Sequence, residues 1–363
     1  MNPKLANQNI LIVSNEPWGD MWFSKHHYAN ELAKLGASVY FANPPKKWKL
    51  KNIFTFKIKK NKIKDNLFEL NYANHFPVFI QNSIFSRLND QLFFLKLKSH
   101  IPPEEKLTVW SFDPFRFTLI SFYKKLKRIY HIADPYMGNK NDLILAKKAN
   151  LIVCTNSNYT DYYSKLNNNV IHIQHGISDS EFKVDINVIS DIKKKYGDFV
   201  ILTGSIYSDI NLKLINNISK KYKVLLLGVV ISNDIEKTEW QLLLDNQNIH
   251  YLGIINGLDL KNYIAAAKVC LLCYNYDIPR TGSLKVINYL AQHKPIVTSV
   301  GIELEHLENK FIFRAKNNTE FMKYIEQNYN TEGKSFELLD HFLSEINYKN
   351  LIQNILLQLN KVD

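Results

Sequence analysis

The sequence predicts an α/β protein made of two doubly wound, Rossmann-like domains, and two observations support this prediction. Short apolar runs suited to buried strands alternate with helical patterns from residues 9–14 onward, and the alternation starts again at residues 198–203. A chain of 363 residues, 46% hydrophobic and 22% charged, also has enough material for two cores. We therefore expect one domain over residues 1–178, a second over residues 179–340, and a C-terminal helix within residues 341–363 that packs back on the first domain.

The first domain opens with a strand, a helix and a second strand. Residues 9–14 form the buried run, Tyr28 and Leu32 lie at helical spacing within residues 24–35, and a strand follows at residues 39–41. A β-α-β opening implies a parallel sheet. The later elements that we expect are strands at residues 107–112, 128–132, 151–155 and 170–173, and a helix at residues 141–150.

Polar residues follow these strands at the edge of the sheet where open parallel sheets bind ligands. Asp20 lies in the loop after the first strand, His26 begins the helix that follows, and Asp134 comes after the strand at residues 128–132. We take these three residues as candidates for contact with a substrate. The alternative is structural, with His26 and Asp134 capping helices.

The positive charge is concentrated in the first half of the chain. Residues 1–176 carry 25 Lys and Arg against 12 Asp and Glu, a net charge of +13, whereas the rest carries 21 against 22, a net charge of −1. Lysines interleave with aromatic residues at 44–64, and the blocks FFLKLKSH and FYKKLKR repeat the pattern. This pattern predicts a basic, membrane-facing surface whose partner is an anionic bilayer, although a solvated basic face is the alternative. No recognisable nucleic-acid-binding module accompanies the charge, so we do not expect nucleic acid as a partner.

No apolar run approaches the roughly 20 residues that a membrane span needs, and the N-terminus has no signal-peptide core. We expect a cytoplasmic protein, peripheral at the inner face of the cell membrane. Cys270 and Cys273 resemble a metal or redox pair, but they lie in a buried strand, where residues three apart point to opposite faces. We interpret them as core thiols.

The second domain repeats the alternation and contains an unusual concentration of charge. Strands are expected at residues 198–203, 223–228, 249–253 and 269–274, and a helix over residues 284–291 precedes a strand at residues 296–297. Two cations, two hydroxyls and a flexible glycine surround the start of that helix: Arg280, Thr281, Gly282, Ser283 and Lys285. Such a group suits a phosphate or diphosphate, and a solvated surface pair is the alternative.

Several segments resemble one family of enzymes. These are ADPY after a strand, ANLIVCTNS, VIHIQHGISDSEF, QNIHYLGIINGLDLKNYIAAAKVCLLCY and SLKVINYLAQHKPIVTS. They resemble the nucleotide-sugar glycosyltransferases of the GT-B fold, in which two Rossmann-like domains face each other across a cleft. The chain is most similar to the family 4 (group 1) type of bacterial surface-polysaccharide glycosyltransferases.

The resemblance implies a donor site in the second domain and an acceptor site in the first. Gly204 and Ser205 would place backbone N–H groups near a diphosphate, together with the five residues around 280–285, and Ile254 would lie past the nucleobase. Asn288 stands where a ribose-binding glutamate is usual and can still bond a ribose hydroxyl. The donor would be a UDP- or GDP-linked sugar, and no cofactor is implied.

We expect the reaction to be independent of metal ions, because no D-x-D motif with a supporting context occurs and Arg280 and Lys285 could stabilise the leaving diphosphate. If configuration is inverted, Asp20 or Asp134 is the predicted base and His26 the third choice. If configuration is retained, His26 and Lys25 would orient the donor sugar.

The predicted function is transfer of a sugar from a nucleotide donor to a growing, lipid-linked or oligosaccharide acceptor, as in the synthesis of capsule, exopolysaccharide or O-antigen. Two alternatives stand beside it. A sugar-nucleotide epimerase shares the two-domain build, and a non-catalytic relative would bind nucleotide or glycan without turnover.

Overall fold

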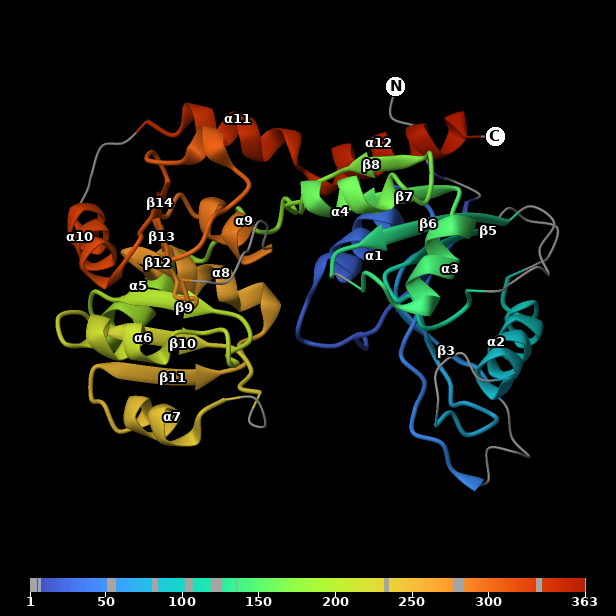
Figure 1. Ribbon diagram of the computed structural model, residues 1–363, viewed down its shortest axis with the longest axis horizontal. Helices are drawn as coiled ribbons and strands as arrows, with labels where there is room; N and C mark the ends of the chain where they lie inside the picture. Colours follow the sequence, from blue (N-terminus) through green and yellow to red (C-terminus); the bar gives the residue numbers. More distant parts are fainter. Residues whose placement is uncertain are drawn as a thin grey trace. The chain divides into compact units, whose positions relative to one another are not determined.

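The computed structural model forms two compact units, residues 1–174 with 348–363 and residues 175–347, which we call unit 1 and unit 2 (Figure 1). The structure describes residues 5, 8–50, 57–79, 84–101, 107–118, 126–134, 136–231, 235–276, 284–330 and 335–362. Each unit is a parallel sheet with helices, which confirms the predicted fold class. The divisions after residues 174 and 347 lie close to the expected boundaries at 178 and 340.

Within the described residues, the sheet of unit 1 has eight strands in the order β3-β4-β2-β1-β5-β6-β7-β8. All neighbours are parallel except β3 and β4. The order reverses direction between β1 and β5, which pair with each other. The strands are β1 (Asn9–Val13), β2 (Ser38–Ala42), β3 (Lys59–Lys64), β4 (Leu67–Asn71), β5 (Leu107–Ser111), β6 (Leu126–Ile132), β7 (Leu151–Cys154) and β8 (Val170–His172).

The helices of unit 1 include one that comes from the far end of the chain. They are α1 (Ser24–Lys34), α2 (Ile84–Leu97), α3 (Lys140–Lys148), α4 (Ser157–Tyr163) and α12 (Tyr348–Lys361). α12 packs against α1, and its residues Ile352 and Ile355 join Tyr28 and Leu32 in one buried cluster (Figure 1). The preceding helix, α11 (Glu337–Glu345), belongs to unit 2.

A basic strand of unit 1, β3, spans residues 59–64. Alternation in FTFKIK predicts a strand over residues 54–59, of which 54–56 lie outside the described residues. After β3, Asn66 adopts a φ of +60°, and the chain returns as antiparallel β4. Asparagine tolerates this conformation better than most residues, so Asp65-Asn66 fixes the register of the hairpin.

Unit 2 has, within the described residues, six parallel strands in the order β11-β10-β9-β12-β13-β14. Numbered within the unit, this is the order 3-2-1-4-5-6 of dinucleotide-binding folds, which reverses between its first and fourth strands. The strands are β9 (Val200–Thr203), β10 (Val224–Leu227), β11 (Ile249–Gly253), β12 (Val269–Leu272), β13 (Ile296–Thr298) and β14 (Ile312–Arg314).

Four of the six strands of unit 2 are buried along their whole length, because helices cover both faces of a parallel sheet. Cys270 and Cys273 are buried in this core, as the sequence predicts. The helices are α5 (Ile186–Tyr196), α6 (Leu212–Ser219), α7 (Lys237–Leu244), α8 (Gly257–Ala266), α9 (Leu284–Leu290), α10 (Asn318–Tyr329) and α11, with the 3-10 helix η2 (Glu305–Leu307). Among the described residues, no helix is long and apolar enough to cross a membrane.

Candidate functional site

In unit 2, the point where the strand order reverses lies between β9 and β12, and this is where open α/β sheets bind ligands. Gly204 follows β9, and Tyr274 lies just beyond the end of β12. Lys285, in the first turn of α9, reaches both. A Cβ atom built on Gly204 would lie 3.0 Å from Lys285 Nζ, and this nitrogen is 5.3 Å from the centre of the Tyr274 ring. The structure therefore places Lys285 beside Gly204, two of the residues that the sequence assigns to the donor site.

The charge of Lys285 has no counterion in the part of the chain that the structure describes. Its amine lies against a glycine backbone and over an aromatic ring, and none of the carboxylates with described positions forms a salt bridge with it. A half-buried cation at the ligand-binding edge of a parallel sheet can stabilise an anion.

Two glycines allow this close packing. Gly204 has a φ of +99° and Gly228, after β10, has a φ of +141°, both in the region that favours glycine. A Cβ atom on Gly228 would lie only 2.0 Å from the Gly204 carbonyl oxygen, so the two backbone segments touch. The Gly204 N–H donates to Leu227 O at 2.8 Å. The expectation that the Gly204 N–H faces a diphosphate is therefore wrong, because this N–H is already bonded to the last residue of β10.

Tyr289 fixes α9 to the central strand of unit 2, and sequence reasoning missed it. This fully buried side chain accepts hydrogen bonds through its hydroxyl from Thr203 N–H at 2.8 Å and Thr203 Oγ1 at 3.0 Å. Tyr289 lies about one helical turn beyond Lys285, so the same helix holds the lysine beside Gly204. The signal in the sequence was weak, since a tyrosine on the buried face of a helix is usually part of the core.

The remaining predicted donor residues are only partly placed. Ser205 and Asn288 are half-buried, the first directly after Gly204 and the second on α9. Ile254, directly after β11, is 53% exposed. Arg280, Thr281, Gly282 and Ser283 lie outside the described residues.

The three candidate catalytic residues of unit 1 differ in exposure. Asp20 and Asp134 are exposed, the first in the loop after β1 and the second after β6. His26 is fully buried. Its Nδ1 accepts the Phe23 N–H at 3.1 Å, and its Nε2 donates to the Pro17 carbonyl at 3.1 Å. Burial, with a smaller effect of the Lys25 charge, lowers the pKa of His26 to about 4. The imidazole is therefore neutral near pH 7 and caps the helix, which matches the structural alternative.

The neighbouring residue, Lys25, is also bonded to other residues of the protein. Although it lies at the start of α1, it is only 4% exposed and forms an ion pair with Glu16 and a hydrogen bond with Asn15. Asn15 in turn donates to Tyr136 Oη at 3.4 Å. These contacts connect the loop after β1 to the segment after β6.

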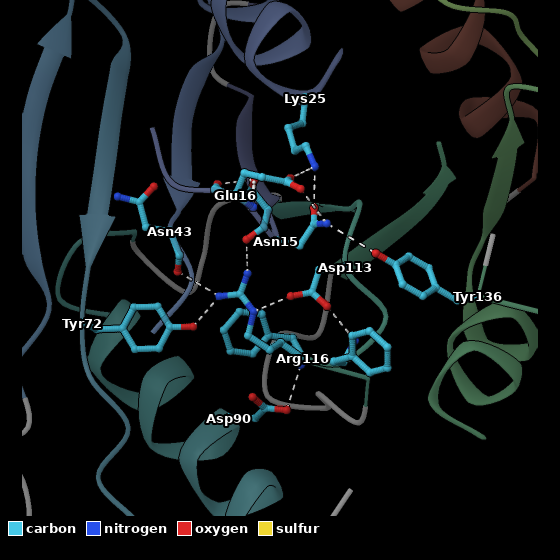
Figure 2. A network of polar contacts seen from close by, with 12 residues as sticks. Asn15, Glu16, Lys25, Asn43, Tyr72, Asp90, Asp113, Arg116 and Tyr136 are labelled. Atoms are coloured by element: carbon cyan, nitrogen blue, oxygen red, sulfur yellow. Dashed lines mark hydrogen bonds and ion pairs between the residues drawn. The ribbon is translucent and has the colours of Figure 1, made fainter. Parts of the chain in front are cut away.

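A buried arginine organises the place where the strand order of unit 1 reverses, between β1 and β5. Arg116 Nε donates to Asp113 at 2.7 Å, and Nη1 donates to Tyr72 Oη at 2.6 Å and to Asn43 O at 2.9 Å. Its Nη2 donates to the carbonyl of Ser14, directly after β1. Figure 2 shows this network, in which Asp90 also lies near the arginine. The sequence places Asp113 among the polar residues at the carboxyl ends of strands, with the end of a strand as the structural alternative, but it does not identify Arg116.

A pocket of about 250 Å³ lies beside this network. Asp90, from α2, accepts the Phe117 N–H at 2.8 Å, and burial, with the nearby Asp113 charge, raises the pKa of Asp90 to about 7. The residues that line the pocket are Asn15, Pro44, Pro45, Asn74, Val78, Ser86, Asn89, Asp90, Asp113, Phe115, Arg116 and Tyr136. Among the residues with described positions, no three His, Cys, Asp or Glu side chains group as metal ligands would.

Comparison with known proteins identifies the fold through solved structures. No family model matches the sequence, and no curated protein matches it. Solved structures do match over nearly the whole length. Anabaena HepE in complex with UDP and glucose aligns with a TM-score of 0.68 at 14% identity, covering 97% of this chain and 99% of that one. Sucrose-phosphate synthase from Thermosynechococcus elongatus aligns with a TM-score of 0.67 at 11% identity, covering 98% and 100%.

A third similar structure is the UDP-GlcNAc 2-epimerase from Methanocaldococcus jannaschii, with a TM-score of 0.56 at 11% identity, covering 96% of this chain and 99% of that one. Identities this low establish the fold alone. The chain has the GT-B fold, as the sequence predicts.

Proposed function

We propose that this chain, a protein of the GT-B fold, is a glycosyltransferase that moves a sugar from a nucleoside diphosphate bound by unit 2 to an acceptor bound by unit 1. The observation that carries the proposal is the Lys285 amine beside Gly204, where the strand order of unit 2 reverses. A diphosphate gains negative charge as the sugar leaves, and a fixed cation stabilises that charge. Complexes of HepE with UDP and with UDP-glucose support a uridine nucleotide as the donor.

The other donor contacts in the proposal follow from the placement of unit 2 residues. The exposed Ile254 side chain would pack against the nucleobase, and Asn288 would bond a ribose hydroxyl. Ser205 would offer its hydroxyl to the phosphates. Arg280, Thr281, Gly282 and Ser283 immediately precede α9 and would complete the anion site.

The proposed mechanism uses no metal ion. The bond between the sugar C1 and the phosphate oxygen breaks, and Lys285, with Arg280, takes up the charge that a metal would otherwise balance. Asp20 or Asp134 would accept the proton of the attacking hydroxyl in an inverting reaction, because both carboxylates are exposed. His26 would act only as a positioning residue, since its two ring nitrogens are already bonded.

We further propose that the acceptor is lipid-linked, as for the surface polysaccharides of bacteria, and that α2 holds unit 1 against an anionic membrane at the inner face of the cell. Ile84, Leu88 and Leu95 lie on one face of α2 and are 71%, 37% and 49% exposed. The opposite face, with Phe93, Phe94 and Leu97, is buried. Exposed cations flank the outer stripe: Arg87 and Lys96. An apolar stripe between cations is typical of helices that lie in the interface of anionic bilayers.

Vesicle flotation tests the membrane proposal. The wild type should float with vesicles that contain anionic lipid and not with neutral vesicles, and Leu88→Glu with Leu95→Glu should abolish flotation because charges replace the apolar stripe. Leu357→Glu is the control, since Leu357 is a 57% exposed leucine on α12. Equal flotation of the double variant and the wild type would show that α2 does not bind the membrane.

The experiment for the enzymatic proposal is incubation with a panel of UDP-, GDP-, CMP- and dTDP-sugars. A transferase releases free nucleotide, faster when an acceptor is present. The fold likeness to a UDP-GlcNAc 2-epimerase makes epimerisation the second candidate, which would isomerise the sugar without any acceptor. Nucleotide binding without any product would indicate a non-catalytic relative.

A further inference from the structure

The pocket of unit 1 lies where open α/β sheets bind their ligands. It borders the ends of β1 and β5, where the strand order reverses, and includes Asn15 and Asp113 from the segments after these two strands. Its volume of about 250 Å³ is below the roughly 300–1,000 Å³ of sites for drug-sized ligands. The pocket therefore suits one small unit, such as a monosaccharide, rather than a whole nucleotide.

We propose that this pocket is the acceptor subsite and that it takes an uncharged sugar unit, which it recognises through hydroxyl hydrogen bonds to Asp90, Asp113 and Tyr136. The inference rests on the glycosyltransferase function proposed above and names the chemical class of its acceptor.

The charge balance of the pocket excludes an anionic ligand. Arg116 is the only cation among the lining residues of this pocket, and its hydrogen bonds to Asp113, Tyr72, Asn43 and Ser14 use all three of its guanidinium nitrogens. Asp113 balances this one cation, and burial raises the pKa of Asp90 to about 7, so the lining that the structure describes carries less than one net negative charge near pH 7. A phosphate or a carboxylate would find no free cation among these residues, unlike at Lys285 in unit 2.

The groups that remain for a ligand are those that sugar hydroxyls need. Asp113 accepts one hydrogen bond on each carboxylate oxygen within the protein, from Arg116 Nε and from Phe115 N–H at 2.8 Å, and each oxygen can accept another. Asp90 Oδ2 accepts from Phe117, whereas Oδ1 accepts from none of the residues that the structure describes. A hydroxyl that donates to a carboxylate makes a charge-assisted bond, about twice as strong as a neutral one.

The remaining wall of the pocket is apolar and suits the carbon face of a sugar ring. Phe115 and Tyr136 meet edge to face, with ring centres 5.2 Å apart, and Val78, Pro44 and Pro45 line the same space. The Tyr136 hydroxyl accepts one long hydrogen bond, from Asn15 at 3.4 Å, and its own proton can be donated to a sugar oxygen. A lining that combines carboxylates with aromatic rings suits a neutral, hydroxyl-rich ligand better than a purely apolar one.

The test measures the binding of sugar probes to the full chain, without nucleotide, by saturation-transfer NMR. The probes are methyl glycosides of glucose, galactose, mannose, rhamnose and N-acetylglucosamine, compared with glucose 6-phosphate, glucuronate and methyl glucosaminide. We expect at least one neutral glycoside to bind, and the anionic sugars to bind at least about tenfold more weakly. At pH 8, above the raised pKa of Asp90, Asp90→Asn should weaken binding of the neutral glycoside by about tenfold, because the charge-assisted bond is lost.

Asp161→Asn is the matched control, since Asp161 is an exposed acid on α4, and it should bind as the wild type does. Tyr136→Phe removes one hydroxyl and should also weaken binding, so it carries the test if Asp90→Asn fails to fold. Stronger binding of glucose 6-phosphate or methyl glucosaminide than of every neutral glycoside would overturn the inference. So would unchanged affinity in both folded variants, or the absence of any glycoside binding. Failure to bind UDP would instead contradict the function proposed for unit 2.

Discussion

Replacing Gly204 with alanine tests the close contact on which the donor site depends. Gly204 has a φ of +99°, where a residue with a Cβ atom is strained by about 1–3 kcal/mol. The new Cβ atom would also lie 3.0 Å from Lys285 Nζ and 3.1 Å from its Cε, so the end of the lysine must move away. A loss of about 2 kcal/mol in a unit of this size lowers Tm by about 4–8 °C.

The effect of Gly204→Ala on nucleotide binding should exceed what strain alone causes. Displacing Lys285 removes a charge-assisted hydrogen bond to the diphosphate, worth about 1.5–3 kcal/mol, so calorimetry should show UDP affinity falling by about 10- to 150-fold. In the double variant with Lys285→Ala the two losses should not add, because both variants remove the same interaction.

Gly197→Ala provides the matched control for backbone strain. Gly197 ends α5 with a φ of +70°, but a Cβ atom there would meet only Lys223 Nζ, at an ordinary distance of 3.7 Å. This variant should lose a similar amount of stability and keep the wild-type affinity for UDP. Wild-type UDP affinity in Gly204→Ala, or fully additive losses in the double variant, would refute the reasoning.

Three further predictions concern stability. Tyr289→Phe leaves the buried Thr203 N–H without its partner and should lower the free energy of unfolding by about 1–3 kcal/mol in urea titrations; no change would contradict the anchoring role. Burial lowers the pKa of His27 to about 3, so below pH 6.5 the unfolded chain binds a proton that the folded chain does not. Stability should fall by about 3 kcal/mol from this residue by pH 4, and His27→Gln should remove that pH dependence; identical pH profiles would disprove it. Arg116→Met leaves Asp113 buried and unpaired and should cost about 3–5 kcal/mol, and a melting temperature equal to that of the wild type would contradict this.

The fold could be predicted because its signals are local. Apolar runs such as residues 10–13 and 224–227 are continuous rather than alternating, which is what strands covered on both faces require. The β3–β4 hairpin shows the limit of such patterns. Alternation alone fitted residues 54–59, but the turn at Asn66 determines which lysines pair with β4.

The residues of the two candidate sites also differ in how well the sequence predicts them. The sequence assigns both Gly204, at the end of a strand, and Lys285, at the start of a helix, to a diphosphate site, although it does not predict their direct contact. Arg116 could not be predicted, since its partners Ser14 and Asn43 are 102 and 73 residues away and contribute backbone carbonyls, which carry no sequence signal. His26 was a candidate for substrate contact because it follows the loop after β1. Its two ring nitrogens are instead bonded to nearby backbone groups, those of Pro17 and Phe23.

The most direct test of the account is a calorimetric titration of UDP into the wild type, Lys285→Ala and Lys221→Ala. Lys221 is an exposed lysine of unit 2 that pairs with Glu326, and its replacement should leave UDP affinity unchanged. Lys285→Ala should weaken UDP binding by about 10- to 150-fold, in line with the loss of one charge-assisted hydrogen bond. Equal affinity of the wild type and Lys285→Ala would contradict the claim that this lysine binds the diphosphate of the donor.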